Sequence, residues 1–331
     1  MAIETKAFAR AGILGNPSDG YFGKIIAITV KDFEARVILD ESAELMIQSS
    51  KDDIPVYKNM QDLVRRVDLY GYYGGVRLIQ AAIKKFFEYV QRQNVQLEKK
   101  NFSMRYSTYI PRQLGLGGSS AIITAAFRAL MEFYKVGIPL EILPTIILEA
   151  ERDELGINAG YMDRVIQVYE GCVYMDLDKK NIEGRGYGVY ERLDASLLPA
   201  LYLAYKPALG KISGMVLDDI RQGYDRGDPL VLETLKRIAE KAELGKKALM
   251  ERDFELFHRL MDENFDLRGR IMKISASNQE MIEAARLCGA SAKFAGSGGS
   301  IIGMYWDEEM YARLEKDLRK IGAKIIRPTI E

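Results

Sequence analysis

The chain has 331 residues, enough for two domains of typical size, and its 48% hydrophobic and 28% charged residues exclude a disordered protein. Lysine plus arginine and aspartate plus glutamate each number 47, so no net positive charge attracts nucleic acid or an acidic membrane surface. We therefore expect a small molecule as the partner, with no nucleic acid and no membrane.

The sequence also indicates a cytoplasmic location. No apolar run approaches the roughly 18 residues that span a bilayer, and the first six residues lack the apolar stretch of a signal peptide. Cys172 and Cys288 are far apart and are expected to be buried thiols in a reducing compartment. His258, the sole histidine, falls on a predicted helix, where we expect a surface or packing role and no Ser-His-Asp triad.

The N-terminal part of the chain is predicted to form a strand, a loop and a hairpin. Residues 9–14 form the strand, and residues 15–20, which are rich in turn formers, form the loop. Segments 24–30 and 34–39 then show the alternating, β-branched character of strands and are predicted to pair as a hairpin.

Arg10 and Asp19 make this first loop a candidate for ligand binding. They place a cation and a carboxylate one strand-length apart, so that one group faces a phosphate and the other accepts hydrogen bonds from sugar hydroxyls. Both residues are equally compatible with surface charges, and the loop with a plain β-turn.

The next elements are a loop, a helix and a strand. Residues 49–53 are the most loop-like part of a mixed polar segment, and residues 70–75, rich in tyrosine and glycine, open a helix over 76–91. The apolar residues of that helix recur at helical spacing and are predicted to face the core. Residues 101–110 alternate like a strand and lead into a glycine-rich segment.

This glycine-rich segment, residues 111–121, continues directly into the apolar, helix-forming residues 122–130. Its glycines allow positive φ angles and a close approach to a ligand, while its serines can cap the helix. Free N–H groups of a first helical turn, together with the helix dipole, bind phosphate. Taken alone, the segment is equally a loop with an N-cap; two further glycine-rich loops favour phosphate binding. The residues concerned are Gly115, Gly117, Gly118, Ser119 and Ser120.

Acidic residues follow in a helix predicted over 141–154 and in the loop 156–164. Glutamates at a helix end, such as Glu151, are usually solvated, but a carboxylate near a triphosphate is a magnesium ligand. Asp163 and Arg164 are either a helix N-cap with a neighbouring surface charge or a catalytic acid-base pair beside a phosphate.

Two paired segments, residues 165–169 and 172–176, are predicted to close the first domain, with the domain boundary between 177 and 198. The elements that follow alternate between strands and helices, which predicts an α+β fold. They are a strand at 201–205, helices at 212–226, 229–250, 253–271 and 277–288, a strand at 291–295, a glycine-rich loop at 296–300, an apolar segment at 301–305, a helix over 311–320 and a strand at 323–326.

The three glycine-rich loops, at residues 15–20, 115–121 and 296–300, together with the acidic loop 156–163, resemble the motifs of the GHMP kinases in order and spacing. This superfamily includes galactokinase, homoserine kinase, mevalonate kinase and phosphomevalonate kinase. A P-loop NTPase is disfavoured because no Gly-x-x-x-x-Gly-Lys-Ser/Thr occurs. A Rossmann dehydrogenase is disfavoured because no second βαβ unit with a ribose-binding acid follows the central loop.

The match covers nearly the whole chain. The family's phosphate loop is matched by Pro111 to Ala121, except that Gly118 stands where its first serine is expected, and its third motif is matched by residues 293–299. The resemblance implies the two-domain GHMP kinase fold. It predicts an N-terminal domain similar to domain 2 of ribosomal protein S5 over residues 1–195, and a C-terminal ferredoxin-like α/β sandwich over residues 196–331.

Within that superfamily the chain is most similar to the glucuronokinases, which phosphorylate the C1 hydroxyl of D-glucuronic acid with ATP. Two alternatives stay open: a GHMP kinase for another small alcohol, such as galactose, a heptose phosphate or mevalonate, and a non-catalytic binding protein of the same fold. The resembling segments are residues 14–19, 21–23, 71–78, 111–113, 118–122, 292–294 and 296–299.

The resemblance also implies roles for single residues. Asp163 matches the aspartate that faces the sugar hydroxyl, as catalytic base or as the group that orients it, and Arg10 matches a position near the transferred phosphoryl group. Asp19 matches the acid that accepts ring hydroxyls, and Gly298 and Gly299 are assigned to substrate binding. ATP binding is assigned to Pro111, Gly115, Leu116, Gly117, Gly118, Ser119, Ser120 and Ala121.

Mg²⁺ is the implied metal, held by Glu151 and by Ser119, or by Ser120 if Gly118 is an insertion. The partners implied are ATP and a small sugar, and a homodimer is left open. A uronate carboxylate requires a cation in the site. The cations nearest to the motifs are Arg112, Arg164 and Lys24, of which Lys24 is also a candidate bystander.

Overall fold

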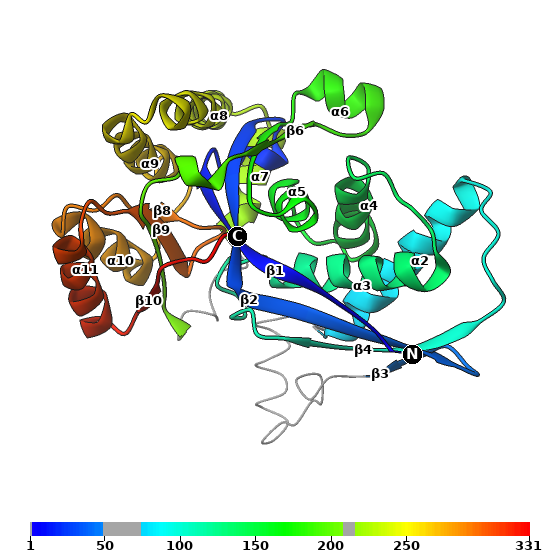
Figure 1. The fold of residues 1–331 in the computed structure, drawn as a ribbon. Helices are drawn as coiled ribbons and strands as arrows, with labels where there is room; N and C mark the ends of the chain where they lie inside the picture. The colour runs from blue at the N-terminus through cyan, green and yellow to red at the C-terminus, as the bar shows by residue number, and fades with distance from the viewer. Residues whose placement is uncertain (1, 49–73, 208–215) are drawn as a thin grey trace, which may run out of the picture.

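The structure is a computed structural model that describes residues 2–48, 74–207 and 216–331 (Figure 1). The loop predicted at 49–53, the residues 70–73 that precede the helix predicted over 76–91, and the start of the helix predicted over 212–226 lie outside the described residues. Within them, helices and strands are mixed in both halves of the chain, so the predicted α+β fold is confirmed.

The first half of the chain builds a sheet of six described strands in the order β3-β4-β2-β5-β6, with β1 paired to β2. Figure 1 shows β2 running along the whole sheet, with the helices of this half over one face. Most neighbours are antiparallel, and β3 pairs with β4 in parallel. The strands are β1 (Ile3–Leu14), β2 (Lys24–Ser42), β3 (Met46–Gln48), β4 (Asn101–Thr108), β5 (Cys172–Asp176) and β6 (Val189–Leu193).

The hairpin predicted from segments 24–30 and 34–39 is wrong, because both belong to the single strand β2. The pairing of β2 with β1 jumps from Phe8 opposite Glu34 to Ala9 opposite Val30, so residues 31–33 form a bulge. The C-terminal tail holds this bulge: Lys31 N donates to Thr329 O at 2.8 Å, and Thr329 N donates to a carboxylate oxygen of Asp32 at 2.8 Å. Residues 31–33, which resemble a turn in the sequence, are therefore stabilised by residues almost 300 positions away.

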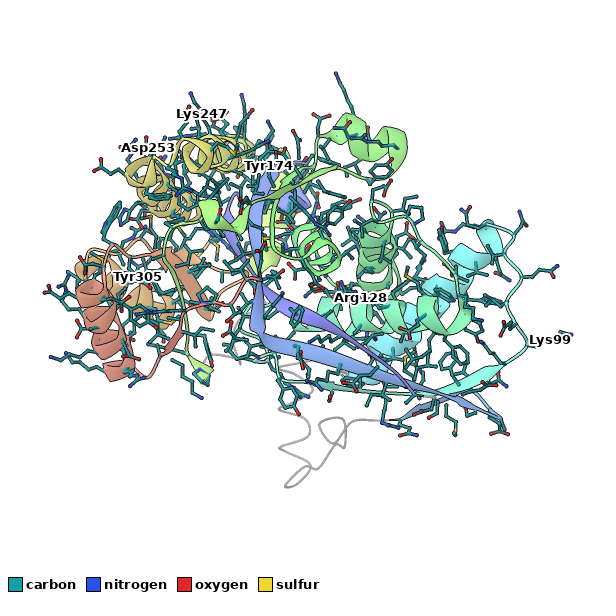
Figure 2. The ribbon with its side chains drawn as sticks, viewed as in Figure 1. Lys99, Arg128, Tyr174, Lys247, Asp253 and Tyr305 are labelled. Atoms are coloured by element: carbon teal, nitrogen blue, oxygen red, sulfur yellow. The ribbon has the colours of Figure 1, made fainter. Side chains whose placement is uncertain are left out.

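The helices of the first half pack on one face of this sheet, with α3 lying against β1 and β2 (Figure 1). Arg128 of α3 donates to Lys6 O of β1 at 2.6 Å and to Gln167 O at 2.8 Å, which ties the strand to the helix that contains Gln167 (Figure 2). The helices are α2 (Gly75–Arg92), α3 (Gly118–Tyr134), α4 (Leu143–Glu149), which continues as a π-helical turn (Ala150–Glu154), α5 (Met162–Tyr169) and α6 (Lys179–Arg185).

The pairing predicted between residues 165–169 and 172–176 is also wrong. Residues 165–169 belong to helix α5, whereas residues 172–176 form β5 and pair with β2 and β6. Val165 and Ile166 are buried against strand residues of β2 and β5. A short, fully buried run of apolar residues has the same sequence pattern in a helix as in a strand. Periodicity alone therefore does not distinguish the two.

The second half builds a sheet of four described strands in the order β10-β7-β9-β8. The four predicted helices are confirmed within the described residues, and the third ends three residues earlier than predicted. The elements are β7 (Leu201–Tyr205), α7 (Val216–Asp225), α8 (Pro229–Glu251), α9 (Phe254–Arg268), α10 (Ala276–Leu287), β8 (Lys293–Phe294), β9 (Ser300–Met304), α11 (Glu308–Lys320) and β10 (Lys324–Ile326). The division between residues 195 and 196 stays a prediction.

One hydrophobic core extends across both halves, because α8 packs against β1 and β2 and α9 packs against β1. Lys246 of α8 also lies over the ring of Tyr174 in β5, with Nζ 4.7 Å from the ring centre. Asn264 of α9 is fully buried, accepts a hydrogen bond from Gly15 N at 2.7 Å and donates to Asn16 O at 3.1 Å. The first glycine-rich loop is therefore fixed to the second half of the chain.

The cysteines and the histidine, for which the sequence predicts no role in the site, lie where it predicts. Cys172 and Cys288 are buried and unpaired, as predicted, and His258 stacks on Trp306 at 5.7 Å between ring centres, which confirms a packing role. Among the described helices, not one combines the length and the apolar character that crossing a bilayer requires.

Candidate active site

The phosphate loop adopts the backbone that an anion-binding helix start requires. Gly115 and Gly117 have φ angles of 64° and 76°, and Gly117 is the N-cap of α3 with no side-chain hydrogen bond to the first turn. The first N–H groups of α3 therefore have no capping side chain and can bind phosphate oxygens. The prediction that Ser119 and Ser120 cap the helix is wrong, since both lie inside α3 and bond elsewhere.

The third glycine-rich loop packs directly on the phosphate loop. A Cβ atom on Gly296 would lie 2.0 Å from Gly115 O, and one on Gly115 would lie 2.6 Å from Ser297 N, so neither position has room for a side chain. Ser300 Oγ donates to Leu114 O at 2.6 Å. The two loops thus approach at backbone distance because glycines lie where they meet.

Gly298 and Gly299, predicted to bind substrate, have φ angles of 131° and 80° and face the phosphate loop and α10. Gly299 N donates to Asn278 Oδ1 at 3.0 Å, and a Cβ atom on Gly299 would lie 2.8 Å from Leu114 Cδ2. Their observed contacts are therefore packing contacts beside the phosphate loop, and the substrate role stays a prediction.

Arg10 and Asp163 meet at the start of α3, although 153 positions separate them in the chain. Arg10 Nε donates to Asp163 Oδ1 at 2.6 Å, and Arg10 Nη1 donates to Gly115 O and, at 3.4 Å, to Ala295 O. Arg10 is only 5% exposed. A Cβ atom on Gly117 would lie 3.3 Å from Asp163 Oδ2, so the Arg10–Asp163 pair borders the predicted phosphate site.

Asp19 lies beside this pair, in the 3₁₀ turn Ser18–Gly20. It accepts a hydrogen bond from Met162 N at 3.1 Å, at the start of the helix that contains Asp163. Burial, and then the negative charge of Asp163, raise the pKa of Asp19 to about 6, against the lowering effects of the Met162 N–H group and of Arg10 and Arg164. The first glycine-rich loop and the acidic loop 156–163 therefore supply two neighbouring carboxylates, Asp19 and Asp163.

Ser119 and Glu151 form a pair of oxygen donors suited to Mg²⁺. Ser119 Oγ donates to Glu151 Oε1 at 2.6 Å, and Glu151 is fully buried in the π-helical turn after α4. A hydroxyl and a carboxylate fit a cation that takes oxygen ligands and keeps water and phosphate in its remaining positions. The structure describes no cluster of three or more histidine, cysteine, aspartate or glutamate residues that could hold a metal. Ser120 is instead buried, with Oγ on Gly117 O at 3.0 Å.

Arg164 is buried and not a surface charge, and Asp163 lies in the first turn of α5 instead of capping it, so the N-cap alternative is wrong. Arg164 Nη2 donates to Glu151 Oε2, and its Nη1 donates to Gly160 O at 2.8 Å. Burial, and then the charge of Arg10, lower the pKa of Arg164 to about 9, so the group is a cation at neutral pH. It holds the second oxygen of Glu151.

Lys24 and Arg112 lie outside this cluster of buried charges. Lys24 Nζ contacts Glu243 at 2.8 Å and Asp176 at 3.7 Å, and the side chain is about one quarter exposed. Arg112 is an exposed residue of the loop before Gly115.

The sequence reasoning missed several buried polar residues of the site. Gln167 Nε2 donates to Gly117 O at 2.7 Å, and Lys293 Nζ donates to Gly12 O at 2.6 Å. Arg268 Nη1 donates to Gly296 O at 2.7 Å. Arg268 follows Asn264 by four residues on an otherwise apolar face of α9, and this spacing of two polar residues on a core face was the available signal.

Known proteins resemble this chain over nearly its whole length. The family model described as GHMP kinases N terminal domain matches residues 77–171, and the one described as GHMP kinases C terminal matches residues 246–324. Glucuronokinase 1 and probable glucuronokinase 2 of Arabidopsis thaliana are each 42% identical to this chain over 328 residues, covering 97% of it and 90% and 89% of their own lengths. The structure of Streptococcus pneumoniae phosphomevalonate kinase with phosphomevalonate and AMPPNP superposes with a TM-score of 0.77, at 16% identity and 99% coverage of both chains.

We predict that Gly117→Val abolishes ATP binding without unfolding the protein. A β-branched side chain disfavours the φ angle of 76°, and its Cβ atom would lie 2.9 Å from Gln167 Nε2, at the start of α3. Gly322→Val is a matched control, because Gly322 has a φ angle of 77° with open space around it. Isothermal titration with ATP checks the prediction, and normal affinity in folded Gly117→Val protein would mean that the loop only caps the helix.

We further predict that Ser119→Ala raises the Mg²⁺ concentration needed for activity more than Ser120→Ala does. Ser119 Oγ contacts Glu151, whereas Ser120 Oγ contacts the backbone of its own helix. Titration of activity with Mg²⁺ at saturating ATP measures both variants. The opposite ranking would assign the metal to Ser120 and make Gly118 an insertion.

Proposed function

Because the chain belongs to the GHMP kinase family, we propose that it transfers the γ-phosphoryl group of ATP to the C1 hydroxyl of D-glucuronic acid. The relatives that are 42% identical over 97% of the chain are glucuronokinases, which supports this acceptor. The observation that supports transfer is the Arg10–Asp163 pair at the N-terminus of α3, where a hydroxyl group and a phosphate can meet.

The phosphate loop binds the nucleotide through its backbone in this proposal. The first N–H groups of α3 point out of the helix start, and the positive end of the helix dipole favours negative charge there. The loop is fixed before ATP arrives, because Gly115 O is held by Arg10 and Leu114 O by Ser300. Donors that need no rearrangement stabilise the charge that develops during transfer.

Asp163 and Arg10 act on the two reacting groups. The carboxylate of Asp163 accepts a hydrogen bond from the acceptor hydroxyl, which orients that oxygen toward the γ-phosphorus and provides a base for its proton. Arg10 holds Asp163 through Nε and places positive charge beside the phosphoryl oxygens. Asp19, next to Asp163, accepts hydrogen bonds from the sugar hydroxyls.

Ser119 Oγ and Glu151 Oε1 would hold Mg²⁺, with Arg164 keeping the other carboxylate oxygen in place. When bound, the ion neutralises charge on the phosphate oxygens of ATP. We propose a cytoplasmic location, in keeping with two free buried cysteines. The homodimer stays a prediction.

Sugar selectivity tests the proposal. A site that hydrogen-bonds a uronate carboxylate leaves its own cation unpaired when the C6 hydroxymethyl group of glucose takes that place. We therefore predict that kcat/KM for glucuronic acid exceeds that for glucose by at least about 100-fold. ADP release with ATP, Mg²⁺ and a panel of sugars measures this ratio. Equal use of glucose or galactose, or no turnover of glucuronate, would leave the family assignment but remove the acceptor.

The second prediction from the mechanism is that Asp163→Asn lowers kcat by about 10²–10⁴ while ATP affinity stays nearly unchanged, because Asp163 acts on the acceptor hydroxyl and not on the nucleotide. Asp262→Asn is a matched control, since Asp262 of α9 also pairs with an arginine, Arg286 of α10. An Asp163→Asn enzyme with wild-type kcat would exclude Asp163 from the mechanism.

A further inference from the structure

A glucuronate acceptor needs a cation for its C6 carboxylate, and the positions nearest to the sequence motifs do not supply one. Arg164 is engaged with Glu151, and Lys24 pairs with Glu243 and Asp176 at the surface. Arg112 is exposed. Given the proposed function, the residue that recognises the carboxylate must therefore lie elsewhere.

Arg268, the last residue of α9, is a buried arginine whose hydrogen-bonding capacity is only partly used. It is 2% exposed, Nη1 donates to Gly296 O at 2.7 Å, and Nε contacts Met272 Sδ at 2.9 Å. Its guanidinium lies over the ring of Phe294, 5.1 Å from the ring centre. In the described part of the chain, Nη2 has no hydrogen-bond partner. A buried N–H group left unpaired is unfavourable, and more so when it is charged.

The charge of Arg268 is also without a close counter-ion among residues 2–48, 74–207 and 216–331, where no carboxylate lies within ion-pair distance of it. Burial lowers the pKa of Arg268 to about 10, Asp19 and Tyr21 raise it, and Arg10 lowers it. Asp19 and Arg10, two of the groups that influence Arg268, belong to the proposed sugar site. A buried cation with weak compensation is unfavourable in the free protein and favourable for binding an anion.

Arg10 and Arg268 flank the same glycine. Gly296 O accepts from Arg268 Nη1, and a Cβ atom on Gly296 would lie 2.7 Å from Arg10 Nη1. Arg10 marks the end of the site where the C1 hydroxyl reacts, because it holds Asp163. In a pyranose, C1 and C5 both flank the ring oxygen, and C6 is attached to C5, so the carboxylate lies near the reacting end of the sugar.

We propose that Arg268 binds the C6 carboxylate of the acceptor through its free Nη2 group and thereby selects a uronate over the parent hexose. The planar guanidinium presents donors in a geometry that matches a carboxylate, which a lysine does not. The carboxylate that Arg268 binds takes no part in the reaction, so the residue is expected to affect KM for the acceptor more than the use of ATP.

Arg221 is another cation beside the first glycine-rich loop, and the structure favours Arg268 over it. Arg221 Nη2 donates to Gly20 O at 3.0 Å, Nη1 lies 3.9 Å from Asp225, and the side chain is about one third exposed. Its charge is thus partly paired and partly solvated, so that a carboxylate gains less from it than from Arg268.

Arg268→Met tests the proposal, because methionine keeps an apolar side chain of similar length and removes the charge and the N–H donors of the guanidinium. The kcat/KM values for glucuronate, glucuronamide and glucose are measured with the wild-type protein, Arg268→Met and Arg268→Lys, together with KM for ATP and the melting temperature. For Arg268→Met we expect a loss of about 10²–10³-fold with glucuronate, carried mostly by KM, an unchanged or higher value with glucose, and an unchanged KM for ATP. Arg268→Lys should recover part of the lost activity with glucuronate.

Arg286→Met is the matched control, since it also removes an arginine-aromatic contact, over Phe265, but its N–H groups already bond to Asp262 and Asp266. It is expected to lower the melting temperature without changing the ratio between glucuronate and glucose. An equal loss for all three acceptors, or a raised KM for ATP, in Arg268→Met would show that Arg268 only clamps the Gly296 loop and would overturn the proposal. A wild-type enzyme that turns over another sugar and not glucuronate would overturn the proposed function instead. If Arg268→Met does not fold, the glucuronate-to-glucose ratio of Arg268→Lys decides: an unchanged ratio contradicts the proposal.

Discussion

The buried guanidinium of Arg10 is the interaction on which the site depends. It donates to Asp163 of α5, to Gly115 O of the phosphate loop and to Ala295 O before the third glycine-rich loop, while Arg10 N donates to Leu116 O at 3.2 Å. A buried cation is stable only when its N–H groups have acceptors, so each of these loops must lie where Arg10 reaches it. One residue of β1 thereby positions segments that are 105, 153 and 285 residues away.

Glycines in the loops make these contacts of Arg10 possible. Arg10 can contact three segments of the chain only if those segments approach one another closely, and a side chain on Gly296 or Gly115 would prevent it. The same glycines leave the first turn of α3 uncapped by a side chain. Loop packing and phosphate binding therefore require the same residues, and the structural and functional reasons for glycine at these positions cannot be separated by sequence alone.

Local chemistry allowed the loops and most helices to be predicted, because turn formers, capping residues and apolar periodicity are read over a few neighbouring residues. What was missed depends on distant partners. The bulge at residues 31–33 is held by the C-terminal tail, and α5 was not recognised because its apolar run is short. The residues of the site were predicted as separate motifs, but only the fold shows that Asp19 lies beside Asp163 and that Ser119, not Ser120, lies against Glu151. The spacing of Arg268 from Asn264 marks a polar residue on the apolar face of α9, but only the fold shows that its guanidinium lies over Phe294.

The balance of buried charge explains why such a site favours anionic ligands. Four cations are at most 5% exposed around the loops, namely Arg10, Arg164, Arg268 and Lys293. Burial, and then Arg268 and Arg10, lower the pKa of Lys293 well below its usual value, yet its three hydrogen bonds to Gly12 O, Asn16 Oδ1 and Phe294 O require an ammonium group. The carboxylates among them are Asp19, Asp163 and Glu151, and the raised pKa of Asp19 means that this carboxylate is only partly ionised near pH 6.

Positive charge in excess of its counter-ions destabilises the free protein, and a ligand that brings phosphate and carboxylate groups removes that penalty on binding. Donors fixed in the fold before the ligand arrives lose little conformational entropy when it binds, so affinity for an anionic sugar and for a triphosphate follows from the same arrangement that makes the empty site electrostatically unfavourable.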